Sequence, residues 1–357
     1  MQIREGIVHF EPSDMAFVNR FGPAEAADMV LDFKSAHSLP FLYDTYQMAA
    51  FFHTSRKKMF TCVKNADCEY RCVTIKKING GERRLYVPCP ALRIYQSKIL
   101  HDILAELPVS PYATAYVRGK NLAQNAAPHV KKRFVLTLDI TDFFGSIRFD
   151  QVYSAAFNAR YFPRQIGVML TALCCRRDVL PQGAPTSPAL SNLVMRNFDD
   201  SIGEWCTKRG VAYTRYCDDM TFSADHPLSS VYCKVKDRLT AMGFALNERK
   251  TRFAESSSRQ SVTGLTVNEK LTVSGEYKRR LRQEVYYTLK FGPYDSIRYA
   301  NKTAFIGEEG PEADRYLLHL AGRLNYVLQI EPDSAWFQNA LNEIQKRQAE
   351  LCVPPQE

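Results

Sequence analysis

The sequence contains no apolar stretch long enough to cross a membrane. No run of 18 consecutive apolar residues occurs in its 357 residues, whereas a membrane-spanning helix needs about 20. The N-terminal segment MQIREGIVHFEPSD is charged where a secretory signal peptide requires an apolar core. We therefore expect a cytoplasmic protein with reduced thiols and no membrane partner.

Spacings typical of zinc sites and of repeats are also missing. The ten cysteines include no Cys-x-x-Cys pair, and no histidine completes a zinc-binding spacing with them. No segment recurs along the chain, which argues against a repeat architecture. With 45% hydrophobic and 24% charged residues the chain is not disordered, and its length predicts two or three subdomains.

Acidic side chains are absent from residues 107–138, which carry five basic ones. The whole chain has 47 Lys and Arg against 38 Asp and Glu, a net charge of +9. Residues 1–33 hold six acidic and two basic residues, so they carry −4 and the rest carries +13. Basic clusters suit a polyanion, because neutralising its phosphates releases condensed counterions. A solvated surface is the alternative interpretation of each basic run taken alone.

Three aspartates lie at the ends of predicted strands. Residues 134–138 are a continuous apolar run, typical of a strand buried on both faces, and Asp139 follows directly. Asp218 and Asp219 lie between two short predicted strands. Carboxylates about 4 Å apart repel by roughly 4 kcal/mol at an effective dielectric near 20, so a cluster of three requires a cation or protonation. Two Mg²⁺ ions held by such carboxylates catalyse in-line phosphoryl transfer, whereas an ordinary Asp-rich turn is the alternative.

The order of predicted elements indicates an α+β fold. Across residues 134–267 it is strand, helix, helix, strand, strand, helix, strand, strand, which predicts an antiparallel sheet with helices on one face. β-prone runs at residues 72–78 and 82–87 flank an Asn-Gly-Gly turn, a strong signal for a basic β-hairpin. From about residue 274 the pattern is mostly helical. The predicted helices and short strands of the central region cover residues 150–162, 187–209, 211–216, 220–223 and 228–242.

Five segments resemble, in the correct order, the sequence boxes of reverse transcriptases. They are VLTLDITDFFGSI (135–147), LPQGAPTSPALSNL (180–193), RYCDDMTFS (215–223), GFALNERKTRF (243–253) and the segment 262–268. The first resembles the box with the first metal-binding aspartate, the second the Pro-Gln-Gly segment, and the third the Tyr-x-Asp-Asp box. The fourth resembles the Gly and Lys box, and the fifth the strand that follows it. Agreement of five boxes in order is not expected by chance.

Two further segments narrow the resemblance to retron reverse transcriptases. NAAPH (125–129) matches their Asn-Ala-x-x-His signature, and VTG (262–264) matches their Val-Thr-Gly signature. GRLNYV (322–327) resembles the end of bacterial members, so the resemblance extends from about residue 72 over most of the chain. One departure is Cys217, where retron enzymes more often have alanine. Cysteine is small and tolerates burial, so we expect activity to survive this exchange.

The resemblance implies a right-hand polymerase fold with fingers, an antiparallel-sheet palm and a helical thumb. The N-terminal region and fingers would cover residues 1–133, the palm residues 134–270 with a fingers segment around 150–185, and the thumb residues 271–357. The implied enzyme is an RNA-directed DNA polymerase that copies part of a cognate noncoding RNA of the msr–msd type into single-stranded DNA (msDNA), primed from a guanosine 2′-hydroxyl. Its partners would be this RNA, the RNA-linked DNA product, deoxynucleotides and, optionally, a co-encoded effector protein. The implied biology is defence against phage.

The resemblance also assigns roles to single residues. The implied ligands of two Mg²⁺ ions are Asp139, Asp218 and Asp219, which are catalytic together with Lys250 as the proton donor to pyrophosphate. The implied nucleotide-binding residues are Lys77, Arg83, Phe144, Gln182 and Gly183. Arg83 would hold the triphosphate, because a guanidinium offers paired donors, and Phe144 would exclude a ribonucleotide 2′-hydroxyl. The implied RNA-binding residues are Asn125, His129, Lys278, Arg279, Arg280 and Arg282, the last four near aromatic rings that suit stacking on bases.

Structural alternatives stay open for most of these side chains. Lys76 is an alternative to Lys77, and Arg84 is an alternative to Arg83. Phe144 could belong to the core, Gln182 and Gly183 to a plain turn, and Lys250 to the surface. His129 could be a buried histidine with satisfied hydrogen bonds, and the basic helix after residue 277 could be a solvated face.

Two other functions compete with that of a retron enzyme. One is another bacterial reverse transcriptase, of the group II intron, diversity-generating or abortive-infection type. The Asn-Ala-x-x-His and Val-Thr-Gly signatures together favour retrons over these. The other is a catalytically silent RNA-binding scaffold, which would gain nothing from three clustered aspartates. Their presence therefore argues for an enzyme.

Overall fold

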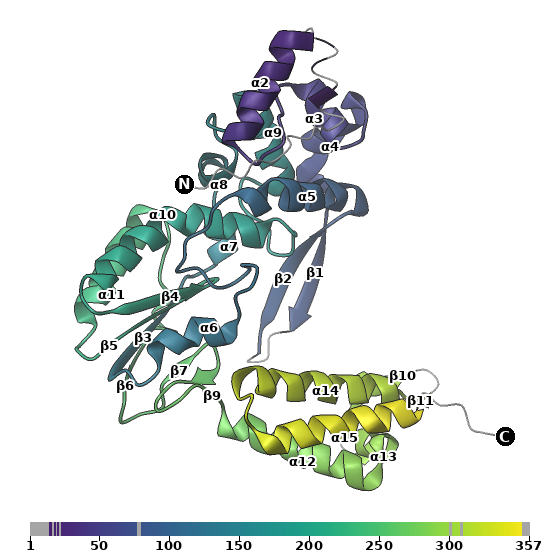
Figure 1. Ribbon diagram of the computed structural model, residues 1–357, viewed down its shortest axis with the longest axis vertical. Helices are drawn as coiled ribbons and strands as arrows, with labels where there is room; N and C mark the ends of the chain where they lie inside the picture. The colour runs from purple at the N-terminus through teal and green to yellow at the C-terminus, as the bar shows by residue number, and fades with distance from the viewer. Residues whose placement is uncertain are drawn as a thin grey trace, which may run out of the picture. The chain divides into compact units, whose positions relative to one another are not determined.

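The computed structural model describes residues 14, 15, 18, 20, 23–76, 80–299, 302–307 and 310–351 (Figure 1). The chain divides into two compact units, each assembled from separate stretches. Unit 1 comprises Met1–Lys120, Leu138–Met220 and Ser229–Thr251, and unit 2 comprises Asn121–Thr137, Thr221–Leu228 and Arg252–Glu357. These units are not the three consecutive regions expected from the sequence, and the division into fingers, palm and thumb stays a prediction.

Helices make up much of unit 1, and their first residues explain where they begin. α3 (Thr45–Phe51) starts with a capping box, in which Asp44 Oδ1 accepts the Tyr46 and Gln47 amides and Gln47 Oε1 accepts the Asp44 amide. Proline is the first residue of α5 (Pro90–Asp102), where the helix needs no amide donor. The other helices of this unit are α2 (Pro23–Ala36), α4 (Arg56–Asn65), η1 (Ala66–Cys68), η2 (Leu104–Glu106), α7 (Phe143–Ser146), α8 (Phe149–Ala156), α9 (Arg164–Cys174), α10 (Ser187–Thr207) and α11 (Ser229–Ala241).

The helix predicted over residues 150–162 is shorter in the structure. α8 ends at Ala156, and the chain turns around Asn158, whose carbonyl accepts the Phe162 amide at 3.1 Å. Asparagine favours such turns, because its side chain bonds nearby backbone groups. The apolar spacing continued to Phe162 because Phe157 and Phe162 are both buried in the core, although the helix had already ended.

The predicted basic hairpin is present in unit 1. β1 (Tyr70–Lys76) pairs with β2 (Glu82–Pro88) in antiparallel register. Gly80 and Gly81 at the turn have φ angles of +83° and +82°, a region that glycine enters without a Cβ clash. The predicted nucleotide-binding residue Lys77 lies outside the described residues.

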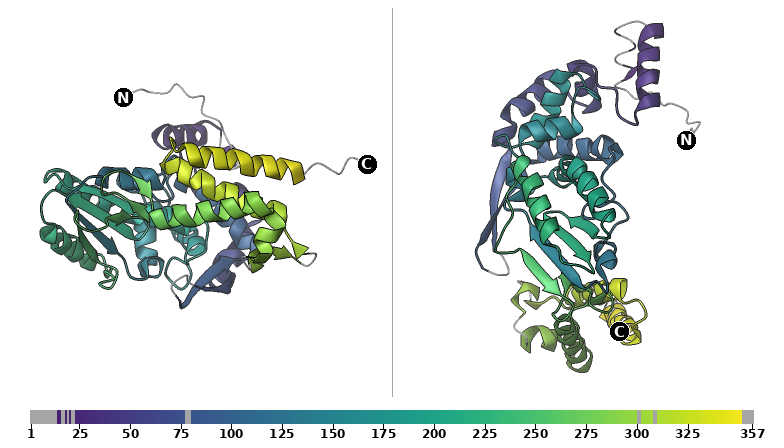
Figure 2. Two further views of the ribbon diagram at one scale, coloured as in Figure 1. Left: turned by 90° about the horizontal axis from the view of Figure 1, so that it is seen from below. Right: turned by 90° about the vertical axis from the view of Figure 1, so that its left-hand side faces the viewer.

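Four strands form the central sheet in the order β4-β5-β3-β6. They are β3 (Phe134–Asp139), β4 (Ala212–Tyr216), β5 (Asp219–Ala224) and β6 (Arg252–Glu255). β3 and β6 are antiparallel, and α10 packs against β4 (Figures 1 and 2). This mixture of helices and antiparallel strands confirms the predicted α+β class.

The C-terminal part of unit 2 is helical, as predicted from about residue 274. α12 (Gly275–Phe291), α14 (Ala313–Ile330) and α15 (Ala335–Leu351) pack side by side around a shared apolar core, and α13 (Pro293–Tyr299) contacts α12 and α14 (Figures 1 and 2). Unit 2 also contains α6 (Leu122–Ala126), η3 (Ala127–His129), η4 (Thr303–Phe305), an antiparallel sheet of β7 (Ser261–Val262), β8 (Leu265–Thr266) and β9 (Thr272–Val273), and a hairpin of β10 (Ile306–Gly307) and β11 (Gly310–Pro311). Within the described ranges of both units, no helix combines the length and apolarity needed to cross a bilayer.

Candidate active site

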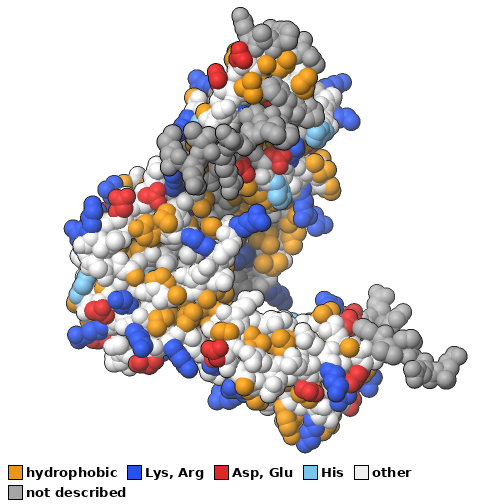
Figure 3. All heavy atoms as spheres, in the orientation of Figure 1, with side chains coloured by type: hydrophobic (Ala, Val, Ile, Leu, Met, Phe, Trp, Pro, Cys, Tyr) orange, Lys and Arg blue, Asp and Glu red, His pale blue; other side chains and the backbone are white. Residues whose placement is uncertain are grey.

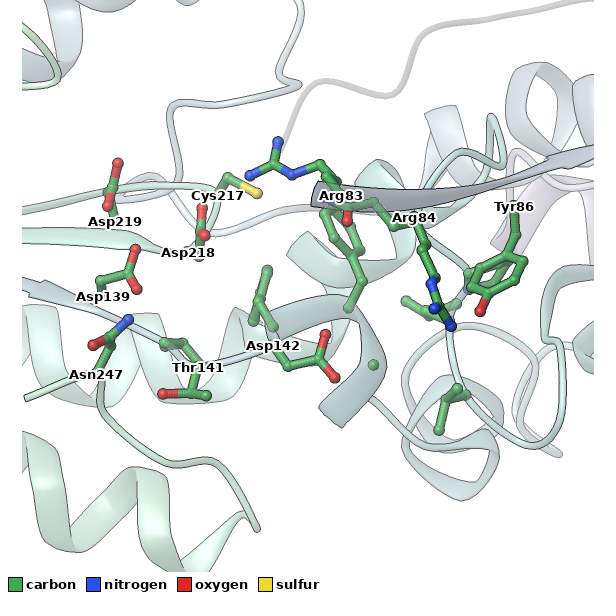
Figure 4. Close-up of a pocket in the computed structure, with 18 of the residues that line it drawn as sticks. Arg83, Arg84, Tyr86, Asp139, Thr141, Asp142, Cys217, Asp218, Asp219 and Asn247 are labelled. Atoms are coloured by element: carbon green, nitrogen blue, oxygen red, sulfur yellow. The ribbon is translucent and has the colours of Figure 1, made fainter. Parts of the chain in front are cut away.

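A hollow of about 840 Å³ opens in unit 1 beside the three predicted metal-binding aspartates (Figure 4). Asp139, Asp218 and Asp219 lie at one end of it, and Arg83 and Arg84 of β2 lie further along. The other predicted residues in its lining are Phe144, Gln182 and Lys250. Side chains that are far apart in the sequence are thus brought into one hollow.

Backbone hydrogen bonds hold the end of β3 beside the turn between β4 and β5. Asp139 is the last residue of β3, and Asp219 is the first residue of β5. The Ile140 amide donates to the Asp218 carbonyl at 3.2 Å, and the Asn247 amide donates to the Asp139 carbonyl at 2.8 Å. β3 is apolar because it is an inner strand of the sheet and is largely buried. The burial that made this strand recognisable in the sequence therefore also places Asp139.

The turn that carries the other two aspartates has an unusual backbone. Cys217 has a φ of +62° and is buried, with 7% of its surface exposed. This left-handed region favours glycine, so a cysteine here requires surrounding contacts that hold the turn in place. The small thiol fits the buried position, as its size led us to expect.

The carboxylates in the hollow repel one another. Burial, followed by the charges of Asp218 and Asp139, raises the pKa of Asp219 to about 7. Lys250 Nζ lies 2.7 Å from Asp139 Oδ2, and this hydrogen bond raises the pKa of Lys250. The site therefore attracts positive charge to its aspartates.

These residues fit a divalent cation. Among the residues that the structure describes, no three acidic, histidine or cysteine side chains are already grouped closely enough to coordinate a metal ion. Burial, followed by the charges of Asp218 and Asp139, nevertheless raises the pKa of Asp219, and Lys250 bonds to Asp139. A negatively charged set of oxygens is what Mg²⁺ prefers. Asp139, Asp218 and Asp219 are the residues that would hold it.

The two adjacent phenylalanines after Asp139 lie in different surroundings. Phe143 is buried, with 4% of its surface exposed, and its ring centroid lies 6.1 Å from that of Phe244 in the core. Phe144 is half-buried and lines the hollow. Both rings border the hollow, and Phe144 is the more exposed of the two.

The Pro-Gln-Gly segment packs directly on the hairpin. The Tyr86 amide of β2 donates to the Gln182 carbonyl at 2.7 Å. Gly183 has a φ of +123°, and a Cβ at this position would lie 2.9 Å from the Tyr86 carbonyl oxygen, which is closer than non-bonded atoms tolerate. Gln182 lines the hollow, whereas Gly183 is required by the close approach of the two backbones.

Asn125 and His129, two of the predicted RNA-binding residues, are buried in unit 2. Asn125 Nδ2 donates to Thr263 Oγ1 at 3.3 Å, so the Asn-Ala-x-x-His and Val-Thr-Gly signatures contact each other. His129 Nδ1 lies 2.7 Å from Ser223 Oγ, and burial lowers the pKa of His129 to about 3. With 1% and 0% of their surfaces exposed, these side chains match the alternative of buried, hydrogen-bonded groups.

The four predicted basic residues of α12 differ in exposure. Lys278 is largely buried and forms a 2.8 Å ion pair with Glu331. Arg279, Arg280 and Arg282 are exposed. The guanidinium of Arg282 lies over the Trp336 and Phe337 rings. Basic and hydrophobic side chains lie beside one another on the face of unit 2 shown in Figure 3.

The lining of the hollow also includes residues that the sequence did not single out, and four of them are polar or charged side chains of interest. They are Tyr116, Arg176, Arg177 and Asn247. Tyr116 is 55% exposed, has a φ of +60°, and lies in the stretch without acidic residues. Asn247 belongs to the Gly and Lys box, so that box contained a signal for it. The two arginines lie in a loop after α9, where neither spacing nor composition pointed to the site.

Comparison with known proteins agrees with the geometry of the hollow. The family model described as "Reverse transcriptase (RNA-dependent DNA polymerase)" matches residues 75–270, which include the three aspartates. The Retron Ec86 reverse transcriptase of Escherichia coli is 32% identical over 83% of this chain and 87% of that protein. The Retron Mx65 reverse transcriptase of Myxococcus xanthus is 33% identical over 74% of this chain and 62% of that protein. Among solved structures, a telomerase from Candida albicans aligns at a TM-score of 0.40 and 11% identity, over 78% of this chain and 63% of that chain. The family model and the retron relatives, together with the aspartates at the strand ends, place this chain in the family of retron reverse transcriptases, which are RNA-dependent DNA polymerases.

Proposed function

We propose that this reverse transcriptase copies part of a cognate msr–msd type RNA into msDNA, starting from a guanosine 2′-hydroxyl in that RNA. The observation that carries the proposal is the meeting of Asp139, Asp218 and Asp219 with Arg83 and Arg84 in one hollow. Clustered carboxylates suit metal ions, and guanidinium groups suit a triphosphate. The hollow thus has both groups that nucleotidyl transfer requires.

Asp139, Asp218 and Asp219 are proposed to hold two Mg²⁺ ions. When bound, the ions would help to deprotonate the attacking hydroxyl and would stabilise the leaving oxygen. The hydroxyl oxygen forms a bond to the α-phosphorus, the bond to the bridging oxygen breaks, and pyrophosphate leaves. The hydroxyl proton passes to solvent, and Lys250, whose side chain is 60% exposed, donates a proton to pyrophosphate and regains one from water.

The arginines and Phe144 are proposed to bind the incoming deoxynucleotide. Arg83 and Arg84 are both exposed on β2 and both line the hollow, so either guanidinium can reach a triphosphate there. Phe144 lines the same hollow as these arginines and the aspartates, and its ring is proposed to exclude a ribose 2′-hydroxyl. Gln182 would line the nucleotide, with Gly183 allowing its backbone to approach β2.

Three parts of the chain are proposed to act as fingers, palm and thumb. The basic hairpin supports a fingers role for residues 1–133, which would be joined by the segment around 150–185. The aspartates support a palm role for residues 134–270. The helices α12–α15 support a thumb role for residues 271–357, with Arg279, Arg280 and Arg282 available to RNA phosphates. Asn125 is proposed to join the two retron signatures through Thr263, and His129 to attach the first signature to Ser223, which are structural roles that suit their burial.

The wider biology is proposed from family membership. Retron reverse transcriptases as a family support roles in defence against phage, an RNA-linked DNA product and a co-encoded effector protein. A cytoplasmic location with no membrane partner fits this proposal. None of these points depends on the geometry of the hollow.

Extension of a DNA strand on an RNA template with Mg²⁺ tests the chemistry. We expect Asp218→Asn to lower the rate about 10³-fold or more, because several kcal/mol of metal-borne stabilisation is lost. Asp237→Asn, which changes an exposed aspartate on α11, is the matched control and should keep the wild-type rate. Equal extension by Asp218→Asn and wild type would remove the assignment of the metal ligands.

Nucleic acid purified with the protein tests the retron product. We expect a short DNA whose size shifts after RNase treatment and again after debranching of the 2′–5′ linkage. Linear cDNA without a branch would instead favour another class of reverse transcriptase. Absence of DNA from an enzyme that extends primers normally would contradict the proposal of self-primed synthesis.

A further inference from the structure

Arg215 lies near the end of β4, just before the turn that carries Asp218 and Asp219 and that is called the catalytic turn below. Its side chain is completely buried. Its exposed fraction is 0%, as is that of Asp199 on α10, with which it forms an ion pair. Burying two charges costs free energy, and an apolar pair of similar volume often stabilises a protein equally well. Stability alone is therefore a weak explanation for this pair so close to the aspartates.

The guanidinium of Arg215 bonds both to α10 and to the catalytic turn. Its Nε lies 2.9 Å from Asp199 Oδ1, and its Nη2 lies 2.6 Å from Asp199 Oδ2 and 3.2 Å from Asn192 Oδ1. Its Nη1 donates to the Cys217 carbonyl at 2.9 Å. The planar guanidinium has several N–H donors and can make all of these bonds at once. The ammonium group of a lysine has a single nitrogen and cannot make all of them.

The backbone of Arg215 is fixed as well. Its amide donates to the Tyr112 carbonyl at 2.9 Å, and its carbonyl accepts the Thr114 amide at 2.8 Å. Two residues after Arg215, Cys217 has its left-handed φ of +62°. The Cys217 carbonyl belongs to the peptide group that leads into Asp218, so the bond from Arg215 sets the orientation of that peptide.

We propose that Arg215 is a positioning residue, which holds the Cys217 carbonyl so that Asp218 and Asp219 face the metal ions. Asp199 lies on α10 and fixes the guanidinium, so this ion pair attaches Arg215 of β4 to that helix. The inference rests on the proposed function, because it takes Asp218 and Asp219 as metal ligands. An ion pair that only joins β4 to α10 is the alternative.

Arg215→Lys tests this role, because lysine keeps the charge near Asp199 but loses the bond to the Cys217 carbonyl. Mn²⁺ binding to the full-length, nucleic acid-free chain is measured from the EPR signal of free Mn²⁺. We expect about 10-fold weaker Mn²⁺ binding, as for other residues that orient metal ligands, and a matching fall in kcat with an unchanged KM for deoxynucleotides. Tyr213→Phe is the matched control, since it removes the 2.7 Å hydrogen bond to Asp199 Oδ1 but keeps the bond to Cys217.

The control separates positioning from stability. Tyr213→Phe should lower Tm with wild-type Mn²⁺ affinity and kcat. If Arg215→Lys also lowers only Tm, the ion pair of Arg215 with Asp199 has a structural role alone and the inference is wrong. If Arg215→Lys folds poorly, the double variant Arg215→Met with Asp199→Leu replaces both charges by apolar groups and should show the same weak Mn²⁺ binding. If this double variant binds Mn²⁺ as tightly as the wild type does, the inference is also overturned.

Asp218→Asn distinguishes this inference from the proposed function. If Asp218→Asn binds Mn²⁺ as the wild type does, the assignment of the metal ligands fails. If Asp218→Asn loses Mn²⁺ while Arg215→Lys retains it, only the positioning role fails.

Discussion

Charged side chains around the hollow of unit 1 and in the helices of unit 2 differ in their partners, although Lys250 pairs with Asp139 at the hollow. In unit 2, Glu284 of α12 forms ion pairs with Lys302 and with Arg323, the latter at 2.6 Å. In the hollow of unit 1, carboxylates lie beside carboxylates, and burial and neighbouring charges raise the pKa of Asp219 to about 7. Within the described residues, Arg83 and Arg84 have no ion-pair partner.

This difference separates charges that stabilise the fold from charges that are available to a ligand. Opposite charges packed against each other satisfy one another and leave little capacity for binding. Like charges held together by a sheet cost stability until a cation arrives, and exposed guanidinium groups lack partners until an anion arrives. Substitutions in unit 2 should therefore change stability, whereas substitutions in the hollow should change activity.

The largest effect on stability is expected for Glu284→Gln. Its carboxylate is only 16% exposed, so its loss leaves Lys302 and Arg323 partly buried without a counter-charge. We expect a loss of about 2–3 kcal/mol in the free energy of unfolding, measured with urea. Glu276→Gln, which breaks the exposed pair with Arg280 on the same helix, is the control and should cost less than about 1 kcal/mol. Equal losses in the two variants would remove the contrast between the units.

The next effect, on activity alone, is expected for Arg83→Ala. Loss of charge-assisted hydrogen bonds to the triphosphate should raise the KM for deoxynucleotides by about 10- to 30-fold. Stability should change by less than about 0.5 kcal/mol, because the side chain is exposed. Arg71→Ala on the neighbouring strand β1 serves as the control. A fall in Tm without a change in KM would show that Arg83 stabilises the fold and does not bind the triphosphate. A larger rise in KM for Arg84→Ala than for Arg83→Ala would assign triphosphate binding to Arg84.

The smallest effect is a pH dependence caused by His129. Burial lowers its pKa from 6.5 to about 3, so between these values the unfolded chain binds a proton that the folded chain does not. Stability should therefore fall as the pH is lowered below 6.5, with a contribution of up to about 1.4 kcal/mol per pH unit. His129→Gln should flatten the curve of unfolding free energy against pH between 6.5 and 5, and His101→Gln, at an exposed site, should not. Parallel curves for wild type and His129→Gln would contradict the buried, neutral state.

The parts of the fold that depend on neighbours in sequence could be predicted. An apolar run ending in Asp139 predicts a buried strand, and the glycines at residues 80 and 81 predict a hairpin, because both signals are local. The same local pattern overestimated α8, since burial of Phe162 produces helical spacing whether or not the helix continues. The role of Lys77 was implied by the family resemblance and stays a prediction.

The parts that depend on distant contacts could not be predicted. Nothing near Asn125 shows that it will meet Thr263, or that His129 will meet Ser223, so the burial of Asn125 was not predicted and that of His129 was an open alternative. In the sequence Lys278 resembles its exposed neighbours, but in the structure it forms an ion pair with Glu331, the residue that follows α14. The two compact units also interleave along the chain, because stretches that are distant in sequence join the same unit.

The hairpin and the Pro-Gln-Gly loop are joined backbone to backbone at Tyr86 and Gly183. With their backbones in contact and joined by the Tyr86 to Gln182 hydrogen bond, neither segment can shift on its own without losing that bond. The arginines proposed to bind phosphate and the loop proposed to receive the nucleotide are therefore linked, so a substitution that separates the two backbones would disturb both.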